Sequence, residues 1–258
     1  MYYWNNREAR KERAVKHTAQ VAQRFRKEIQ SSIENTREYF NGESFTVPYR
    51  QNTDMIVEFR QMDSVAAIRK YSAMGGKICV LDFASYNNPG GKFFEGSSAQ
   101  EESLCHESFL YNVLKADSIR GRFYDKHRGA SNKCLYSSHS LYVPDVVFCD
   151  SIPCDVIVCA APNKKAAMQY NHVEAHIVNR CMTDRCADVL KIAAAEQVDV
   201  LILGAFGCGV FGNDPSLVAK SFEELLAEPY AYCFKAVVFA VPDDANGAHF
   251  RKVFGTGE

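Results

Sequence analysis

The residues best suited to chemistry stand in one stretch, residues 82–105, DFASYNNPGGKFFEGSSAQEESLC. A β-rich apolar run enters a turn with Gly90 and Gly91, and Glu101 and Glu102 follow at the start of a predicted helix. Strand, glycine loop and helix in this order form a phosphate-binding layout, because glycine lets the backbone approach an anion and the free N–H groups of a helix start carry partial positive charge. The spacing matches neither common nucleotide fingerprint.

The two adjacent glutamates suggest acid–base work. Side chains of neighbouring residues on a helix diverge by about 100°, so Glu101 and Glu102 do not flank one bond as the two carboxylates of ordinary glycosidases do. A division of labour is expected instead. Ser98 with Glu101 three residues later also predicts a capping box and a helix start at Ala99, which accounts for Glu101 but leaves Glu102 unexplained.

A second glycine-rich loop, GAFGCGVFGND (residues 204–214), follows the apolar run DVLILGA (199–205), which is typical of a buried strand. Ligands of such sheets bind beyond the carboxyl ends of the strands, so both loops are expected at one edge, facing one ligand. No Walker lysine and no clear metal ligands accompany them. This combination predicts a diphosphate that is held rather than transferred.

PGGKFFEGSSAQEESLC resembles the signature of the microbial-type poly(ADP-ribose) glycohydrolases, a family with a macrodomain core. Residues 160–163 (AAPN) and the 204–214 loop match the family pattern in the same order, so the resemblance extends from roughly the N-terminal helix to the end of the chain. Two positions depart from the pattern: Lys92 replaces the usual third glycine, and His106 stands where an arginine is expected.

The resemblance implies ADP-ribose as the ligand, poly(ADP-ribose) or ADP-ribosylated protein as the substrate, and Glu102 as the general acid, with Glu101 holding ribose hydroxyls. It implies that the second loop wraps the diphosphate with Gly207, Cys208, Gly209, Val210 and Phe211, and that Phe211 packs on the distal ribose. The substrate contacts expected from the first loop and its surroundings are Asp82, Phe83, Asn88, Gly90, Gly91, Lys92 and Gln100. Among these, Asn88 is expected to orient the distal ribose, and Asp82 or Phe83 to lie near the adenosine. Phe206 is assigned to the core.

A general acid at this site must carry a proton near neutral pH. A helix N-terminus favours an ionised carboxylate, the wrong direction for an acid at neutral pH, whereas the substrate diphosphate would raise the carboxyl pKa again. Substrate-assisted protonation followed by attack of water on the anomeric carbon is therefore expected. Lys92 requires a backbone conformation that lysine tolerates, and its ammonium either pairs with a substrate phosphate or repels a cationic leaving group such as arginine.

The composition of the chain limits the kind of protein that it can be. The 258 residues are 47% hydrophobic and carry a net charge of −1, which fits one α/β domain and gives no electrostatic footprint for nucleic acid. No apolar run approaches a membrane span, and the chain start, MYYWNNREARKER, lacks the apolar core of a signal peptide. A cytoplasmic protein is expected, with a secreted effector not excluded.

Ten cysteines in such a chain are interpreted as reduced, mostly buried thiols. A zinc site at His172, His176, Cys181 and Cys186 is disfavoured against an ordinary amphipathic helix, because the two cysteines turn to different faces. No cofactor or metal is therefore expected.

Strands are expected near 45–47, 55–59, 77–84, 137–148, 155–159, 199–205 and 235–241. Helices are expected within 5–39 and near 64–74, 99–111, 117–124, 170–197, 215–226 and 245–253. Strands alternating with helices call for a mixed or parallel sheet covered on both faces. The resulting expectation is a macrodomain-like three-layer α/β/α sandwich comprising residues 1–258 as one domain, with residues 1–42 as an N-terminal helical extension.

Two other functions stay open. Lys92 alters the loop nearest the scissile bond, which suits a hydrolase of mono-ADP-ribosylated protein, for example with an arginine linkage. A reader that binds ADP-ribose without turnover is the other alternative, although a pure binder needs neither Glu101 nor Glu102.

Overall fold

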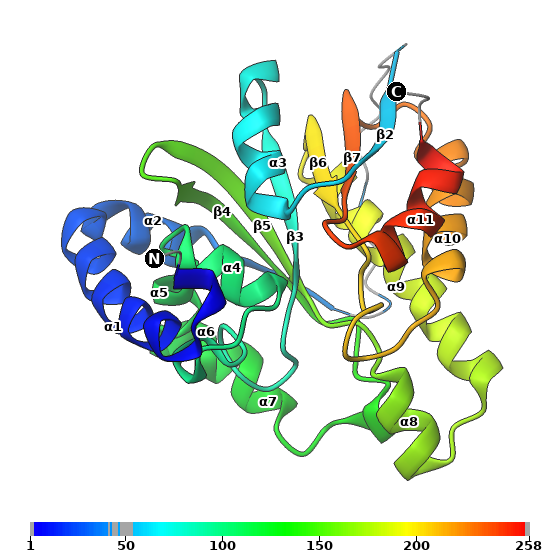
Figure 1. Ribbon diagram of the computed structural model, residues 1–258, viewed down its shortest axis with the longest axis horizontal. Coiled ribbons are helices and arrows are strands. Elements are labelled where there is room, and N and C mark those ends of the chain that lie inside the picture. The colour runs from blue at the N-terminus through cyan, green and yellow to red at the C-terminus, as the bar shows by residue number, and fades with distance from the viewer. Residues whose placement is uncertain (1–2, 41, 43–45, 47–53, 256–258) are drawn as a thin grey trace.

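The computed structural model describes residues 3–40, 42, 46 and 54–255, and a seven-stranded mixed sheet lies at its centre (Figure 1). The strands, in sheet order, are β1 (Arg37–Tyr39), β4 (Ser140–Phe148), β5 (Ile152–Cys159), β3 (Ile78–Phe83), β6 (Val200–Leu203), β7 (Ala236–Ala240) and β2 (Ile56–Arg60). The strands from β5 to β2 pair in parallel, whereas β4 pairs antiparallel with both β5 and β1. The α/β class and mixed sheet expected from the sequence are confirmed.

Helices cover both faces of the sheet (Figure 1). One face carries α1 (Arg7–Arg24), α2 (Arg26–Asn35), α3 (Ser64–Tyr71), α4 (Gln100–His106), α5 (Leu110–Leu114), α6 (Asp117–Ile119) and α7 (Asp125–His127). The other carries α9 (Ala175–Ala195), α10 (Pro215–Ala227) and α11 (Asp244–Phe254), while α8 (Lys164–Asn171) follows β5. Alternate residues of β3 enter the two resulting cores, Val80 on one side and Leu81 on the other, which is why its run is apolar throughout.

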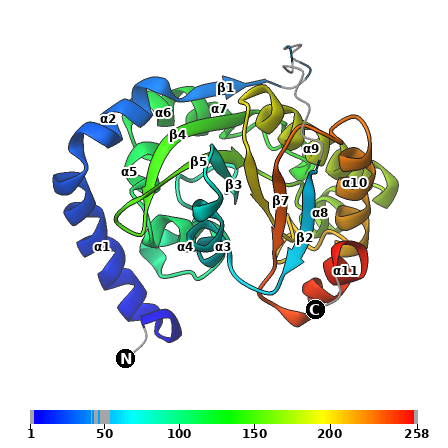
Figure 2. The same cartoon turned by 90° about the horizontal axis from the view of Figure 1, so that it is seen from above.

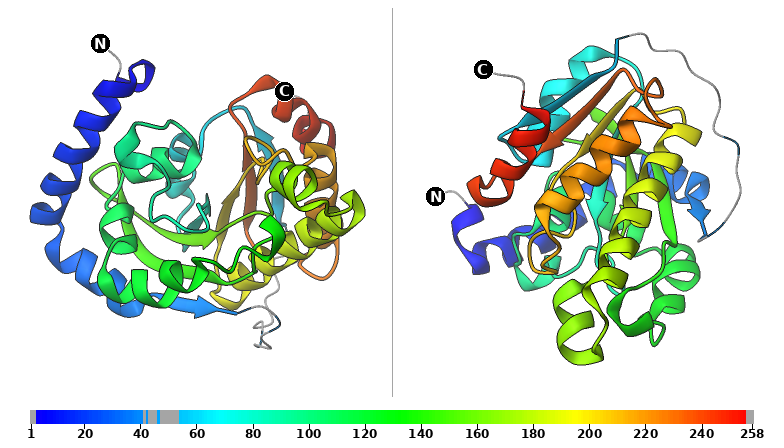
Figure 3. Two further views of the ribbon diagram at one scale, coloured as in Figure 1. Left: turned by 90° about the horizontal axis from the view of Figure 1, so that it is seen from below. Right: turned by 90° about the vertical axis from the view of Figure 1, so that its right-hand side faces the viewer.

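The N-terminal helices α1 and α2 run along the outer side of α4 and α5, at the opposite end of the molecule from α10 and α11 (Figures 2 and 3). One apolar stripe packs these helices onto the rest of the protein: Ala14 and Val21 are buried, and Phe25, Ile29 and Ile33 pack against the same core. Asn6 caps α1, its side chain accepting the N–H groups of Glu8 and Ala9.

Several element boundaries differ from expectation. The helix predicted over 170–197 is two helices, because His172 takes a left-handed conformation (φ 53°) after α8 and α9 begins only at Ala175. The strand predicted from 137 begins at Ser140, and β1 was not foreseen. The strand predicted at 45–47 lies outside the described residues apart from Thr46, which is not in a strand. Among the residues described, no helix is long and apolar enough to cross a membrane.

Candidate active site

The loops that follow β3, β5 and β6 meet at one edge of the sheet because these three strands are parallel neighbours. The ring of Phe83, at the end of β3, lies 5.5 Å from the ring of Phe206, which follows β6. A Cβ on Gly207 would lie 2.6 Å from the Cβ of Ala161, which follows β5. The predicted convergence of the two glycine loops on one edge is therefore present, and the 160–163 turn lies between them.

The backbone of the Gly90–Gly91 turn lies very close to the carboxylates of Glu101 and Glu102. Both glycines have left-handed backbones (φ +67° and +59°), and a Cβ on Gly91 would lie 2.6 Å from Glu102 Oε1 and 2.8 Å from Glu101 Oε2. The N–H of Lys92 donates to Glu102 Oε1 at 2.8 Å, and the N–H of Ser85 donates to Glu101 Oε2 at 2.7 Å. The glycine pair therefore lets the loop bring backbone donors onto both carboxylates.

The carboxylates are buried and only partly satisfied. Glu101 is 4% exposed, Glu102 5% and Asp82 0%. Both oxygens of Asp82, Glu101 Oε1 and Glu102 Oε2 are buried without a hydrogen-bond partner. Burial, and then the charge of Glu102, raise the pKa of Asp82 well above its ordinary value.

Burial and then the charge of Asp82 also raise the pKa of Glu101 well above its ordinary value, against the lowering effect of the Ser85 N–H. Burial thus outweighs the helix N-terminus, which alone would favour the ionised form. The site is arranged to keep protons on carboxyl groups at pH values where exposed carboxyls have lost them.

The predicted capping box at the start of α4 is wrong. Ala99 occupies the N-cap position, where no side-chain cap forms, and α4 begins at Gln100. Glu101 turns its carboxylate to the N–H of Ser85 instead of back toward Ser98. The helix start is held by Gln100, whose amide accepts the N–H of Phe83 (2.9 Å) and donates to the carbonyl of Leu81 (2.8 Å) and the hydroxyl of Ser64 (3.1 Å). These contacts occupy the side chain that was predicted to touch substrate.

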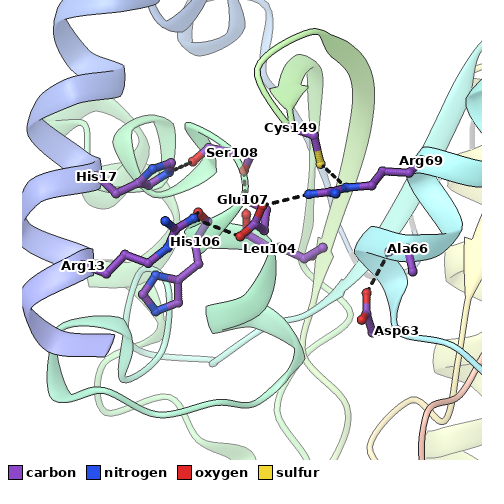
Figure 4. A network of polar contacts seen from close by, with 10 residues as sticks. All are labelled: Arg13, His17, Asp63, Ala66, Arg69, Leu104, His106, Glu107, Ser108 and Cys149. Atoms are coloured by element: carbon purple, nitrogen blue, oxygen red, sulfur yellow. Dashed lines mark hydrogen bonds and ion pairs between the residues drawn. The ribbon is translucent and has the colours of Figure 1, made fainter. Parts of the chain in front are cut away.

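The far end of α4 is fixed by arginines from two other helices (Figure 4). Arg13 of α1 donates to the His106 carbonyl at 3.0 Å and to one carboxylate oxygen of Glu107 at 2.9 Å, while Arg69 of α3 donates to the other at 3.1 Å. Cations at a helix C-terminus complement its dipole. His106 itself is buried between Trp4 and Phe93, and burial lowers its pKa to about 3, so a neutral ring replaces the arginine of the family pattern.

The second loop divides into a packed base and a projecting tip. Asn213 donates from its amide to the carbonyls of Pro162 (2.8 Å) and Gly207 (3.1 Å), which ties the base to the turn after β5. At the tip, Val210 is 81% exposed and a Cβ on Gly209 would meet no atom within 4 Å. Free space of this kind suits a loop that closes around a ligand.

The phenylalanines of this loop differ in environment. Phe206 is fully buried, so its assignment to the core is confirmed. Phe211 is half-buried and lies 6.1 Å from the ring of Tyr136. Cys208 is 8% exposed, and burial raises the pKa of its thiol to about 12, which keeps it protonated.

The first loop differs in detail from expectation. Asn88 is exposed and its carbonyl accepts the Gly91 N–H at 3.0 Å, whereas Oδ1 of the neighbouring Asn87 is buried without a partner. Asn87 is therefore the asparagine whose side chain faces inward, a choice that two adjacent asparagines in a turn do not reveal. Lys92 has an ordinary backbone (φ −108°), and its 71% exposed side chain places the ammonium 3.9 Å from Glu95.

Aromatic residues next to this loop were not foreseen. Tyr86 is stacked between His127 (4.0 Å, 5°) and Tyr136 (4.3 Å, 15°). These partners lie some forty to fifty residues along the chain, and no local pattern links them.

As for metals, the described part of the chain contains no group of three His, Cys, Asp or Glu residues arranged to hold an ion.

Comparison with known proteins agrees with this geometry. A family model described as "Microbial-type PARG, catalytic domain" matches residues 7–150. The poly(ADP-ribose) glycohydrolase (PARG) of Thermomonospora curvata is 29% identical, with a TM-score of 0.83 over 96% of this chain and 100% of that one. The enzyme of Deinococcus radiodurans in complex with ADP-ribose is 30% identical, with a TM-score of 0.79 over 87% and 96%. The curated proteins contain no match to the sequence. With its glycine loop, paired glutamates and sheet topology, the chain belongs to the microbial-type PARG family.

Proposed function

We propose that the protein is an ADP-ribosyl glycohydrolase that releases ADP-ribose from poly(ADP-ribose) or from ADP-ribosylated protein. The observation that carries this proposal is the pair of buried carboxylates, Glu101 and Glu102. Each accepts a backbone N–H through one oxygen, and each keeps the other oxygen buried without a partner. Buried unpaired oxygens are costly in a binding module, whereas an enzyme uses them on its substrate.

The roles proposed for the two glutamates are those that the family resemblance implies, and the contacts of both side chains are compatible with them. Glu102 accepts the Lys92 N–H through Oε1 and keeps Oε2 for proton transfer to the leaving oxygen, as the general acid. The bond from the anomeric carbon to that oxygen breaks, its electrons go to the oxygen, and water then attacks the oxocarbenium-like carbon while giving one proton to the Glu102 carboxylate. Glu101, with its raised pKa, is a neutral acid that can both donate to and accept from ribose hydroxyls.

The loops supply the binding contacts in this proposal. Gly207 to Phe211 wrap the diphosphate of the bound substrate. Phe211 packs on the distal ribose, and Asn88 or the inward-facing Asn87 orients it. Asp82 is fully buried and the side chain of Gln100 is bonded to the backbone of β3, so in this proposal both position the site, and Phe83 is the residue that lies near the adenosine. Residues 1–258 form one catalytic domain with a helical extension at 1–42, and the cytoplasm is its proposed location.

A mono-ADP-ribosyl-protein hydrolase is the second candidate, and Lys92 favours it. This exposed cation stands directly beside the N–H that holds Glu102, where it can pair with a substrate phosphate. A polymer must seat a further ADP-ribose unit near this position, so the side chain affects polymer more than a single ADP-ribose.

The test compares two substrates. The purified protein is incubated with automodified polymer and, separately, with mono-ADP-ribosylated protein, and free ADP-ribose is quantified by liquid chromatography. Release from polymer that disappears in Glu102→Gln supports the leading proposal, and release from the mono-modified protein alone supports the second. Binding of ADP-ribose without release from either substrate would assign the protein to the readers. A parallel reaction with EDTA tests the expected independence from metal.

A further inference from the structure

A chain of hydrogen bonds that the proposed reaction does not use runs from the first loop to the edge of the sheet. His127 Nδ1 lies 2.9 Å from the Tyr86 carbonyl oxygen, and His127 Nε2 lies 3.0 Å from His139 Nδ1. His139 Nε2 lies 3.0 Å from Glu38 Oε2. Both imidazoles are buried, at 4% and 7% exposure. Every ring nitrogen of the pair therefore faces a partner at hydrogen-bond distance.

When both rings are neutral, this chain of hydrogen bonds lacks one proton. It has three gaps, and its two ends, the Tyr86 carbonyl and the Glu38 carboxylate, are acceptors. Three gaps need three protons, but two neutral imidazoles bring only two. One gap must then lie between two lone pairs, unless the pair binds one additional proton.

The position of the missing proton follows from acceptor strength. A hydrogen bond to a carboxylate is roughly twice as strong as one to a neutral acceptor, so His139 donates from Nε2 to Glu38 and its Nδ1 is left as an acceptor. An unprotonated imidazole nitrogen is a much stronger base than an amide oxygen, so His127 donates from Nε2 to His139 rather than from Nδ1 to the Tyr86 carbonyl. This leaves the unprotonated Nδ1 of His127 against the Tyr86 carbonyl.

Charged groups from several elements surround the pair. Glu38 of β1 faces His139, and Arg122 lies with its Nε 3.5 Å from the other oxygen of Glu38. Lys126 of α7 and Arg185 of α9 disfavour a positive charge on His127. Burial lowers the pKa of His127 to about 4, and it also lowers that of His139, where Glu38 opposes the effect. The additional proton therefore enters only below neutral pH.

We propose that His127 and His139 are positioning residues that couple proton uptake to the first loop: His127 donates to the Tyr86 carbonyl only when the pair carries one additional proton. The coupling reaches the site because the N–H of the preceding residue, Ser85, donates to Glu101. Above the pKa of the pair, the Tyr86 carbonyl loses its donor and the loop is held less firmly. The effect on ligand affinity rests on the proposed function, whereas the protonation pattern does not.

Glu38→Gln is the decisive variant. Arg122 faces one side-chain oxygen of Glu38, so the glutamine carbonyl takes that place and its amide N–H₂ faces His139. This donor never titrates. It forces His139 to accept through Nε2 and donate through Nδ1, and His127 to do the same, so that the Tyr86 carbonyl keeps its donor at every pH.

The first measurement is the tautomer of both rings, read from long-range ¹H–¹⁵N correlation spectra of the free protein. At about pH 8 the wild type is expected to show both rings protonated at Nε2, and Glu38→Gln both at Nδ1. The exposed Glu34→Gln is the matched control and should retain the wild-type pattern. Identical tautomers in the wild type and Glu38→Gln would overturn the proposal, whatever the activity of the enzyme.

The second measurement is the affinity for ADP-ribose by calorimetry between about pH 4 and about pH 8, a range that reaches the lowered pKa of His127. One hydrogen bond corresponds to about a two- to tenfold change, so Glu38→Gln should bind that much more tightly at the alkaline end, and the difference should shrink toward the acid end. His127→Phe keeps a ring against Tyr86 but lacks the donor, and should stay at the weak level throughout. A constant ratio between the wild type and His127→Phe at all pH values would contradict the coupling. If the wild type did not bind ADP-ribose, the proposed function would fail, and the spectra would still decide the proton count.

Discussion

Gly91→Ala tests whether the glycine turn sets the position of the two carboxylates. The added Cβ would lie 2.6 Å from Glu102 Oε1 and 2.8 Å from Glu101 Oε2, whereas a relaxed C···O contact is about 3.3 Å or longer. The loop or the carboxylates must therefore move by about half an ångström or more. A left-handed alanine costs about 1–2 kcal/mol, and losing the part-buried Lys92–Glu102 hydrogen bond adds about 1 kcal/mol.

The expected loss of unfolding free energy is thus about 2–3 kcal/mol, measured by chemical denaturation. The expected loss of glycohydrolase rate is about 10- to 100-fold, because a displacement of about 1 Å at a reacting group can cost about 10²-fold. Release of ADP-ribose under saturating substrate is the appropriate assay, since it reports the chemical step rather than binding.

Two other glycines separate the contributions. Gly129 has a left-handed backbone (φ +79°) but open space around it, so Gly129→Ala should show the backbone cost alone, about 1–2 kcal/mol. Gly209 lies outside the left-handed region and also has open space, so Gly209→Ala should leave stability nearly unchanged. If Gly91→Ala kept the wild-type rate within about threefold and lost no more stability than Gly129→Ala, the carboxylates would not depend on the turn.

Four further changes test the proposed roles. Glu102→Gln should lower the rate by about 10² to 10⁴ with ADP-ribose affinity, by calorimetry, within a few-fold; a parallel loss of binding would make Glu102 a binding residue. Phe211→Ala should weaken ADP-ribose binding by about 1–3 kcal/mol, and a large fall in the melting temperature of the free protein would instead assign the ring to the core. Lys92→Gly should flatten the salt dependence of ADP-ribose affinity and raise the rate on polymer, and equal polymer rates for the two proteins would separate position 92 from chain-length preference. Because the pKa of Asp82 is raised in the folded state, its contribution to stability is present at low pH and is lost as the pH rises above the unfolded-state pKa. Asp82→Asn should therefore raise the melting temperature relative to the wild type at about pH 8 but not at about pH 4. A melting-temperature difference between the two proteins that stays constant with pH would contradict this.

Sequence patterns predicted most of the sheet because its strands are apolar on both faces. The runs ending at Phe83 and at Leu203 are almost wholly buried, and each is followed by glycines whose spacing is readable without a structure. The order of strands, loops and helices then places both glycine loops at one edge. These parts of the site follow from local composition and one topological rule.

The parts that were missed depend on contacts distant in the chain. Glu101 satisfies every local requirement of a capping box, yet its carboxylate accepts the N–H of Ser85, sixteen residues earlier. Gln100 is drawn to the backbone of β3 in the same way. His127 and His139 carry no motif, since their significance lies in meeting Tyr86 and Glu38 from separate elements. A local sequence pattern cannot predict a hydrogen-bond partner that comes close only when the chain has folded.

Helix α1 has the composition of an ordinary solvated segment, but three of its arginines donate hydrogen bonds to backbone carbonyls in and around α4 and the first loop. Arg7 donates to the Glu95 carbonyl, Arg10 to that of Gly96 and Arg13 to that of His106. The spacing of three residues keeps these side chains along one helical face. One inserted or deleted residue between them would rotate the later arginines by about 100° and separate them from their carbonyls together. Homologues should therefore vary freely in the other charges of this helix while conserving the three arginines and the number of residues between them.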